Sequence, residues 1–122
     1  MYSKKILVVD DEVAILLAFK KLLQKPGIEV DTSESLEEAK EKIKSDSFSA
    51  VIADLRLSGT LGQEGFEIIS AAKAKSPDTK VALITAFGNH GVEEHAKKLG
   101  ADFYFEKPVS SSNLDSILQS IK

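Results

Sequence analysis

The stretch that sets the fold reads Ile6-Leu7-Val8-Val9, followed at once by Asp10-Asp11-Glu12. A short run of apolar residues rich in β-branched side chains predicts a strand that is buried on both faces. The three acids after it are typical of a helix start, where they can cap its amino end. Apolar residues then recur at helical spacing until Pro26-Gly27 ends the helix. They are Ile15, Leu16, Phe19, Leu22 and Leu23.

The same pairing of an apolar run with a helical pattern recurs along the rest of the chain. Further strands are predicted at residues 28–31, 50–53, 81–84 and 103–105. The helical faces after them are predicted from Leu36, Ala39 and Ile43; from Phe66, Ile69 and Ala72 or Lys73; from Val92, Ala96 and Leu99; and from Leu114, Ile117, Leu118 and Ile121. Five strands that alternate with five helices predict an α/β doubly wound fold, with one parallel sheet covered on both sides.

Polar residues at the helix ends agree with this division. Ser33 or Ser35 is expected to cap the second helix, and Ser110 to Ser112 the last one. Gly100 stands where the fourth helix should end, in a position that favours glycine.

Length and composition limit the classes of function. The chain has 122 residues, of which 43% are hydrophobic and 29% charged, so we expect one domain over residues 1–122. A net charge of -3 gives no sign of a nucleic-acid-binding surface. The absence of cysteine excludes disulfides, thiolate catalysis and cysteine-based zinc sites. No signal peptide or membrane span is recognisable, so we expect a cytoplasmic protein without membrane contact.

Polar side chains follow four of the predicted strands at the point where each strand ends. They are Asp10 and Asp11, Asp54, Thr85 and Lys107. Because the carboxyl ends of parallel strands meet at one edge of the sheet, we expect these groups to converge there. Two carboxylates about 4 Å apart repel each other by roughly 4 kcal/mol at an effective dielectric constant near 20. One lysine cannot balance three acids, so the cluster should either take up a proton or recruit a cation, and a hard divalent cation, Mg²⁺ or Mn²⁺, fits the remaining charge.

The same cluster suggests a reaction. A carboxylate can attack phosphorus and form an aspartyl phosphate. Charge then develops on the phosphoryl oxygens, where a cation, a lysine and a hydroxyl group would stabilise it. Asp54, Lys107 and Thr85 supply these groups in the sequence.

At this point the sequence resembles the receiver domains of two-component response regulators. The resemblance lies in Val8-Val9-Asp10-Asp11-Glu12, Ala53-Asp54-Leu55-Arg56, Leu83-Ile84-Thr85-Ala86 and the segment from Leu99 to Pro108, and it extends over essentially the whole chain. It implies a flavodoxin-like, CheY-like fold with the strand order 2-1-3-4-5 and a cis peptide bond between Lys107 and Pro108. Two short segments, Asp54-Leu55-Arg56 and Glu106-Lys107-Pro108, are similar to those in enhancer-binding transcriptional activators.

The resemblance also implies a role for each residue of the site. Asp54 would accept the phosphoryl group from a histidine kinase, with Lys107 and Thr85 assisting. Asp11, Asp54 and the backbone carbonyl of Arg56 would bind Mg²⁺ directly, and Asp10 through water. Thr85 and Tyr104 would form a switch that alters what the surface binds. The implied partners are the kinase, an output domain or downstream protein, and a second copy in a phosphorylation-dependent dimer, with no nucleic acid contact by this domain.

Two features depart from the family pattern. The loop from Leu57 to Gly65 reads Leu57-Ser58 where the family often has Met-Pro, and Gly65 comes about three residues late. Phe87 lies two residues after Thr85, where an apolar side chain cannot position an attacking water. We therefore predict slow self-dephosphorylation.

Other interpretations of the same residues stay open at this stage. Asp10 and Asp11 could only cap the first helix, and Tyr104 could only fill the core. A magnesium-dependent phosphatase would share the acidic cluster, but Arg56 stands where its general acid would be expected. A pseudo-receiver that is never phosphorylated is the main alternative, and a flavin carrier lacks its phosphate-binding loop. His90 and His95 are expected to be solvated helix residues rather than metal ligands.

Overall fold

The computed structural model describes residues 4–57, 63–86 and 88–122. One parallel sheet contains β1 (Lys4–Val9), β2 (Ile28–Ser33), β3 (Ala50–Asp54), β4 (Lys80–Thr85) and β5 (Phe103–Glu106). The strand order is β2-β1-β3-β4-β5, as the resemblance implied. Each strand is one or two residues longer than its predicted run, and Asp54 and Thr85 are the last residues of their strands rather than the first after them.

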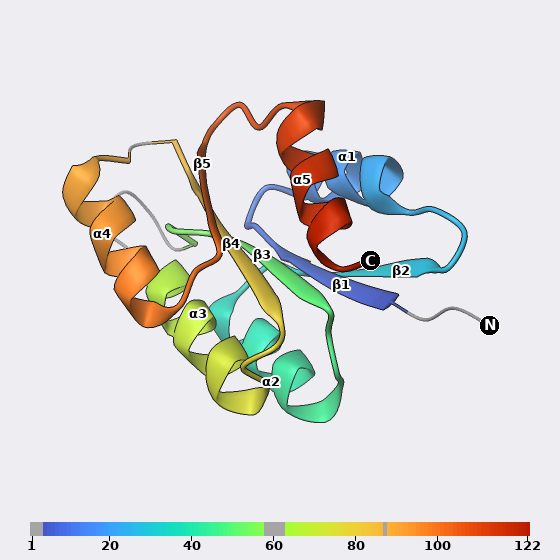
Figure 1. Cartoon of the computed structure of the whole chain (residues 1–122), viewed down its shortest axis with the longest axis horizontal. Coiled ribbons are helices and arrows are strands. Elements are labelled where there is room, and N and C mark those ends of the chain that lie inside the picture. Colours follow the sequence, from blue (N-terminus) through green and yellow to red (C-terminus); the bar gives the residue numbers. More distant parts are fainter. Residues whose placement is uncertain (1–3, 58–62, 87) are drawn as a thin grey trace.

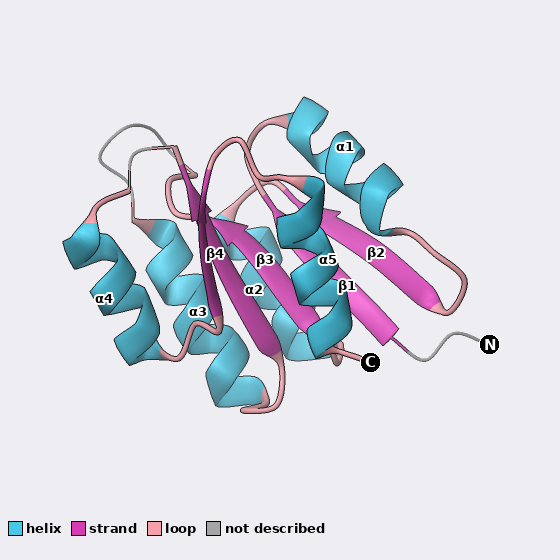
Figure 2. Ribbon diagram, turned by 45° about the horizontal axis from the view of Figure 1, so that its top comes forward, coloured by secondary structure: helices cyan, strands magenta, loops and turns pink. Residues whose placement is uncertain are grey.

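Helices cover both faces of the sheet (Figures 1 and 2). The helices α1 (Val13–Leu23) and α5 (Ser111–Ser120) pack on one face, and α2 (Leu36–Ser45), α3 (Glu64–Lys75) and α4 (His90–Leu99) on the other. Alternate residues of the central strands feed two separate cores. Leu7, Val9 and Leu83 face α2, α3 and α4, while Ile6, Val8 and Ile84 face α1 and α5.

The predicted ends of the helices are largely confirmed. Ser35 caps α2 by accepting the Glu38 N–H group, whereas Ser33 is the buried last residue of β2. Ser110 caps α5 in a reciprocal pair with Asn113. Gly100 ends α4 with φ at 111°, a left-handed conformation in which a side chain would be strained.

Two residues of the predicted helical faces lie elsewhere. On α1, Leu16, Phe19 and Leu23 are buried, but Leu22 is 50% exposed because it lies about 100° around the helix from Leu23. On α3, Ala72 rather than Lys73 faces the core. Lys73 instead reaches along α3 to the amino ends of β4 and β5. None of the described helices combines the length and apolar character that a membrane crossing requires.

Candidate functional site

Backbone hydrogen bonds hold the predicted site residues at the carboxyl edge of the sheet. Asp10 N–H donates to the Ser33 carbonyl group at 3.1 Å, and Lys107 N–H donates to the Thr85 carbonyl group at 2.9 Å. Each bond continues a strand ladder by one residue. The side chains that follow the strands therefore project from a rigid edge, which confirms the predicted convergence of Asp10, Asp54, Thr85 and Lys107.

The centre of the site is the ammonium group of Lys107. Its Nζ atom lies 3.0 Å from Asp10 Oδ2 and 3.1 Å from Asp54 Oδ2. The second oxygen of each carboxylate accepts a backbone N–H group: Asp10 Oδ1 from Glu12 at 2.9 Å, and Asp54 Oδ1 from Arg56 at 3.4 Å. The side chain of Asp10 is fully buried, so its charge is held in place by these contacts.

The site carries more negative than positive charge. Asp10, Asp11 and Glu12 place one carboxylate oxygen each within 4.8 Å of one another. Asp10, Asp54 and Glu12 face the ammonium group of Lys107, which lies 3.9 Å from Glu12 Oε1. Burial raises the pKa of Asp54, and the charge of Asp10 raises it further, although Lys107 opposes both. A bound cation would relieve this excess of negative charge.

Lys107 responds to the same surroundings. Burial by itself would lower its pKa, but the hydrogen bond to Asp10 and the charges of Asp54 and Asp10 raise it above the ordinary value. Lys107 therefore stays charged at neutral pH, which is what its predicted role in binding phosphoryl oxygens requires.

These contacts bear on whether Asp10 and Asp11 cap the first helix or belong to the acidic site. Glu12, not Asp10 or Asp11, is the N-cap residue of α1, and its side chain makes no capping bond. Asp10 faces Lys107, and Asp11 is exposed beside it. Oxygen donors of this density suit Mg²⁺, and Asp10, Asp11 and Asp54 remain the predicted ligands together with the Arg56 carbonyl. Glu12 was missed as a member of the cluster, although its place in the run Asp10-Asp11-Glu12 could have indicated it.

Two further residues support the segment that carries Asp54. Gly65 N–H donates to the Leu55 carbonyl group, and Glu64 Oε1 accepts the Leu57 N–H group at 3.1 Å. A Cβ atom on Gly65 would lie 2.7 Å from the Asp54 carbonyl oxygen and from Leu55 Cα. Only glycine fits there, which gives Gly65 a steric role that spacing alone could not predict.

The two predicted switch residues lie on neighbouring strands. Thr85 is buried at the end of β4, and Tyr104 on β5 pairs with Leu83 and packs against the core that faces α4. Lys107 and Pro108 are joined by the expected cis bond. Phe87 and residues 58–62 lie outside the described residues, so slow dephosphorylation stays a prediction.

The two histidines are surface residues of α4. His90 Nε2 lies 2.7 Å from Glu94 Oε1, and the ring of His95 packs edge-on against Phe66 with centroids 4.4 Å apart. In the described part of the chain, neither histidine belongs to a group of potential metal ligands.

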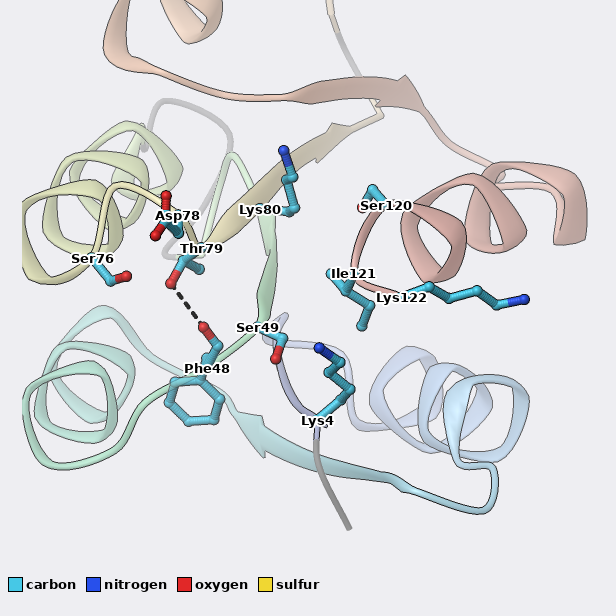
Figure 3. A pocket seen from close by; sticks show the side chains of 10 residues that line it. All are labelled: Lys4, Phe48, Ser49, Ser76, Asp78, Thr79, Lys80, Ser120, Ile121 and Lys122. Atoms are coloured by element: carbon cyan, nitrogen blue, oxygen red, sulfur yellow. Dashed lines mark hydrogen bonds between the residues drawn. The ribbon is translucent and has the colours of Figure 1, made fainter.

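The hollow in Figure 3 lies at the opposite edge of the sheet from the acidic site. Its volume is about 340 Å³, and it is bordered by the amino ends of β1, β3 and β4 and by the end of α5. Thr79 Oγ1 there donates to the Phe48 carbonyl group at 2.7 Å. None of the predicted site residues lines this hollow.

Comparison with known proteins gives a consistent result. The family model described as the response regulator receiver domain matches residues 6–119. The acid tolerance regulatory protein ActR of Rhizobium meliloti (strain 1021) is 32% identical over 112 residues, which are 92% of this chain and 56% of ActR. The alginate biosynthesis transcriptional regulatory protein AlgB of Pseudomonas aeruginosa is 32% identical over 90% of this chain and 24% of its own length. The chain thus spans about half or less of the length of these two relatives.

Solved structures agree with the fold and with the family match. A CheY-like receiver domain protein from Methanospirillum hungatei JF-1 superposes with a TM-score of 0.86 and 28% identity, covering 97% of this chain and 93% of that one. The beryllofluoride-activated NtrC4 receiver domain, solved as a dimer, has a TM-score of 0.85 and 34% identity, covering 98% and 97% of the two chains.

Proposed function

Because the chain belongs to the response regulator receiver domain family, we propose that it takes a phosphoryl group onto Asp54 in a reaction that needs a divalent cation. The observation that carries this proposal is the position of Lys107, which bonds both Asp54 and Asp10 at a rim with surplus negative charge. The pseudo-receiver alternative gains no support from this site, because the acids, the nucleophile and the lysine all meet.

The proposed reaction transfers phosphorus from a phosphohistidine of a sensor histidine kinase. An oxygen of the Asp54 carboxylate forms a bond to phosphorus while the phosphorus–nitrogen bond breaks. The electron pair leaves with the imidazole, which takes a proton from solvent. Lys107 and the Thr85 hydroxyl group bind the phosphoryl oxygens as negative charge develops on them.

Asp10, Asp11, Asp54 and the Arg56 carbonyl group would hold Mg²⁺ or Mn²⁺ in this reaction. The bound cation would supply neutralising charge at the phosphoryl oxygens. Without it, the raised pKa of Asp54 indicates that its carboxylate is poorly stabilised by the protein alone.

The binding partners and the cellular location of the domain are part of the same proposal. The domain acts on itself rather than on free substrates, in the cytoplasm, and its phosphorylated surface is read by an output domain or a downstream protein. NtrC4, a receiver 34% identical to this chain, was solved as an activated dimer, and this supports dimerisation on phosphorylation here.

The proposal is tested by intact-mass measurement after incubation with acetyl phosphate and Mg²⁺. Wild type should gain the mass of one phosphoryl group, and Asp54→Asn should gain none. Asp78→Asn is the matched control, because Asp78 is an exposed aspartate at the opposite edge of the sheet. A chelator should abolish the gain in wild type. A wild-type chain that stays unmodified with donor and cation in excess would favour the pseudo-receiver alternative.

A further inference from the structure

The inference concerns the space between β4 and α4 that the Tyr104 hydroxyl group occupies. A Cβ atom placed on Gly88 would overlap that hydroxyl oxygen, and it would lie 2.9 Å from both Tyr104 Cζ and Thr85 Cγ2. The two residues of the predicted switch therefore border the same space, and Gly88 leaves it open because it has no side chain.

A side chain at position 88 would meet the side chains of both Tyr104 and Thr85, so glycine at this position keeps free the space between them.

The chain on either side of Gly88 is anchored. Thr85 is the last residue of β4, and its carbonyl group accepts Lys107 N–H at 2.9 Å. Asn89 caps α4 through its Oδ1 atom, which accepts the Val92 N–H group at 2.9 Å. Tyr104 Oη is the end of a side chain that can rotate outward. A Cβ atom at position 88 should therefore displace the tyrosine ring more easily than it displaces the backbone.

The buried Tyr104 hydroxyl group is poorly satisfied by hydrogen bonds. Within the described residues, Tyr104 Oη is buried and makes no hydrogen bond of normal geometry. Burial raises the pKa of its phenol, and the charges of Glu106 and Glu93 raise it further, while the Asn89 backbone opposes the rise. A buried polar group without a good hydrogen-bond partner contributes little to holding its side chain in place. A small steric change can therefore move the Tyr104 ring from its partly buried position to an exposed one.

We propose that Gly88 is a positioning residue whose missing side chain creates the seat for the Tyr104 hydroxyl group beside Thr85. The coupling of Thr85 to Tyr104 is the switch that the family resemblance already implies, and the new element is that Gly88 leaves the space in which the Tyr104 hydroxyl group lies beside Thr85. The coupling rests on the proposed phosphorylation of Asp54, but the seat itself does not.

The seat is tested first in the unphosphorylated protein. The chain has two tyrosines and no tryptophan, so Tyr2→Phe makes Tyr104 the sole fluorescent residue of this kind. In that background, Gly88→Ala should shift acrylamide quenching and the ¹⁹F signal of fluorotyrosine towards the values of an exposed phenol. The pKa of Tyr104 should fall towards its ordinary value. Gly91→Ala is the matched control, because its Cβ atom would meet only Asn89 Oδ1 at 3.3 Å.

A folded Gly88→Ala variant with an unchanged Tyr104 signal would overturn the proposal, since the loop would then have moved instead. If Gly88→Ala fails to fold, the double variant with Tyr104→Leu decides, because that change removes both the hydroxyl oxygen and the Cζ atom that the added Cβ would overlap. Recovery of the fold supports the seat, and continued failure contradicts it.

The coupling is tested by adding acetyl phosphate and Mg²⁺ to both proteins. Wild type should show a Tyr104 signal that changes on phosphorylation, whereas Gly88→Ala should be phosphorylated to the same extent with an unchanged, exposed signal. A Gly88→Ala signal that still follows phosphorylation would refute the coupling. If wild type takes no phosphoryl group, the proposed function fails, while the seat is still judged by the first experiment.

Discussion

Two lysines with nearly equal burial hold aspartates at opposite edges of the sheet. The side chain of Lys107 is 17% exposed and that of Lys73 is 19% exposed. At the amino edge, Lys73 Nζ bonds Asp102 Oδ2 at 2.9 Å and the Thr79 carbonyl group at 2.7 Å. Asp102 Oδ2 also accepts the Val81 N–H group, so the two side chains tie the starts of β4 and β5 together.

The two networks differ in their balance of charge. Lys73 pairs with one carboxylate and otherwise bonds neutral carbonyl groups, including that of Pro77 at 3.3 Å. Lys107 faces Asp10, Asp54 and Glu12 at once. The first network is balanced and fastens the fold, whereas the second keeps an excess of negative charge that can act on a cation and a phosphoryl group.

The largest expected effect comes from replacing each lysine by methionine and measuring phosphorylation. Lys107→Met should lower the rate constant for phosphorylation of Asp54 by roughly 10²-fold, because one charged donor to the phosphoryl oxygens is lost. Lys73→Met should leave the rate within about threefold of wild type, as expected for a site outside the chemistry. Both rate constants are measured by intact mass over time. Equal losses in the two variants would contradict the idea that only the lysine at the carboxyl edge takes part in phosphorylation.

Stability should separate the same two variants in a second way. Lys73→Met should lower the free energy of unfolding by about 1 kcal/mol, because Asp102 and the Thr79 carbonyl group lose a half-buried partner. Magnesium should not restore this loss. The loss in Lys107→Met should be reduced by added Mg²⁺, since the remaining carboxylates can bind the cation. Urea unfolding with and without Mg²⁺ measures both, and a magnesium-insensitive Lys107→Met would contradict the surplus-charge interpretation.

The smallest effect concerns Asp54 in the absence of metal. Its pKa in the folded protein is raised above 3.8, so its protonated form favours folding below that pH, and this contribution is lost as pH rises through the folded value. At neutral pH the wild-type carboxylate therefore costs stability that Asp54→Asn avoids. The variant should therefore be the more stable of the two proteins at neutral pH without metal.

The advantage of Asp54→Asn should shrink as pH falls through the raised pKa of folded Asp54, and it should be gone below the unfolded value of 3.8, where wild-type Asp54 is protonated in both states. Saturating Mg²⁺ at neutral pH should reverse the order of the two proteins. Thermal unfolding across pH checks this, with Asp102→Asn as the comparison. Asp102→Asn should destabilise under both metal conditions, and a stabilising Asp102→Asn would mean that the amino-edge network is no more balanced than the site.

Much of this molecule could be predicted without coordinates, for physical reasons that particular residues illustrate. Ile6 to Val9 predicts a buried strand because only apolar side chains can line both faces of a central strand. Leu22 was assigned to the wrong side of α1, because apolar residues are so frequent between residues 15 and 23 that their spacing defines one helix face only approximately. The sequence could not decide whether Ala72 or Lys73 faces the core. A lysine can lie beside core residues along its aliphatic chain while its ammonium group bonds elsewhere, as Lys73 does with Asp102.

The sequence by itself determined the alternation of strands and helices and the convergence of Asp10, Asp54, Thr85 and Lys107. Periodicity and strand ends depend on local residue types, and parallel strands place their carboxyl ends on one side. Only the tertiary structure decided that Lys107 bridges Asp10 and Asp54, that Glu12 joins the acids, and that Gly65 and Gly88 are needed for space. Those facts depend on distances between segments far apart in the chain, which packing sets and local patterns do not encode.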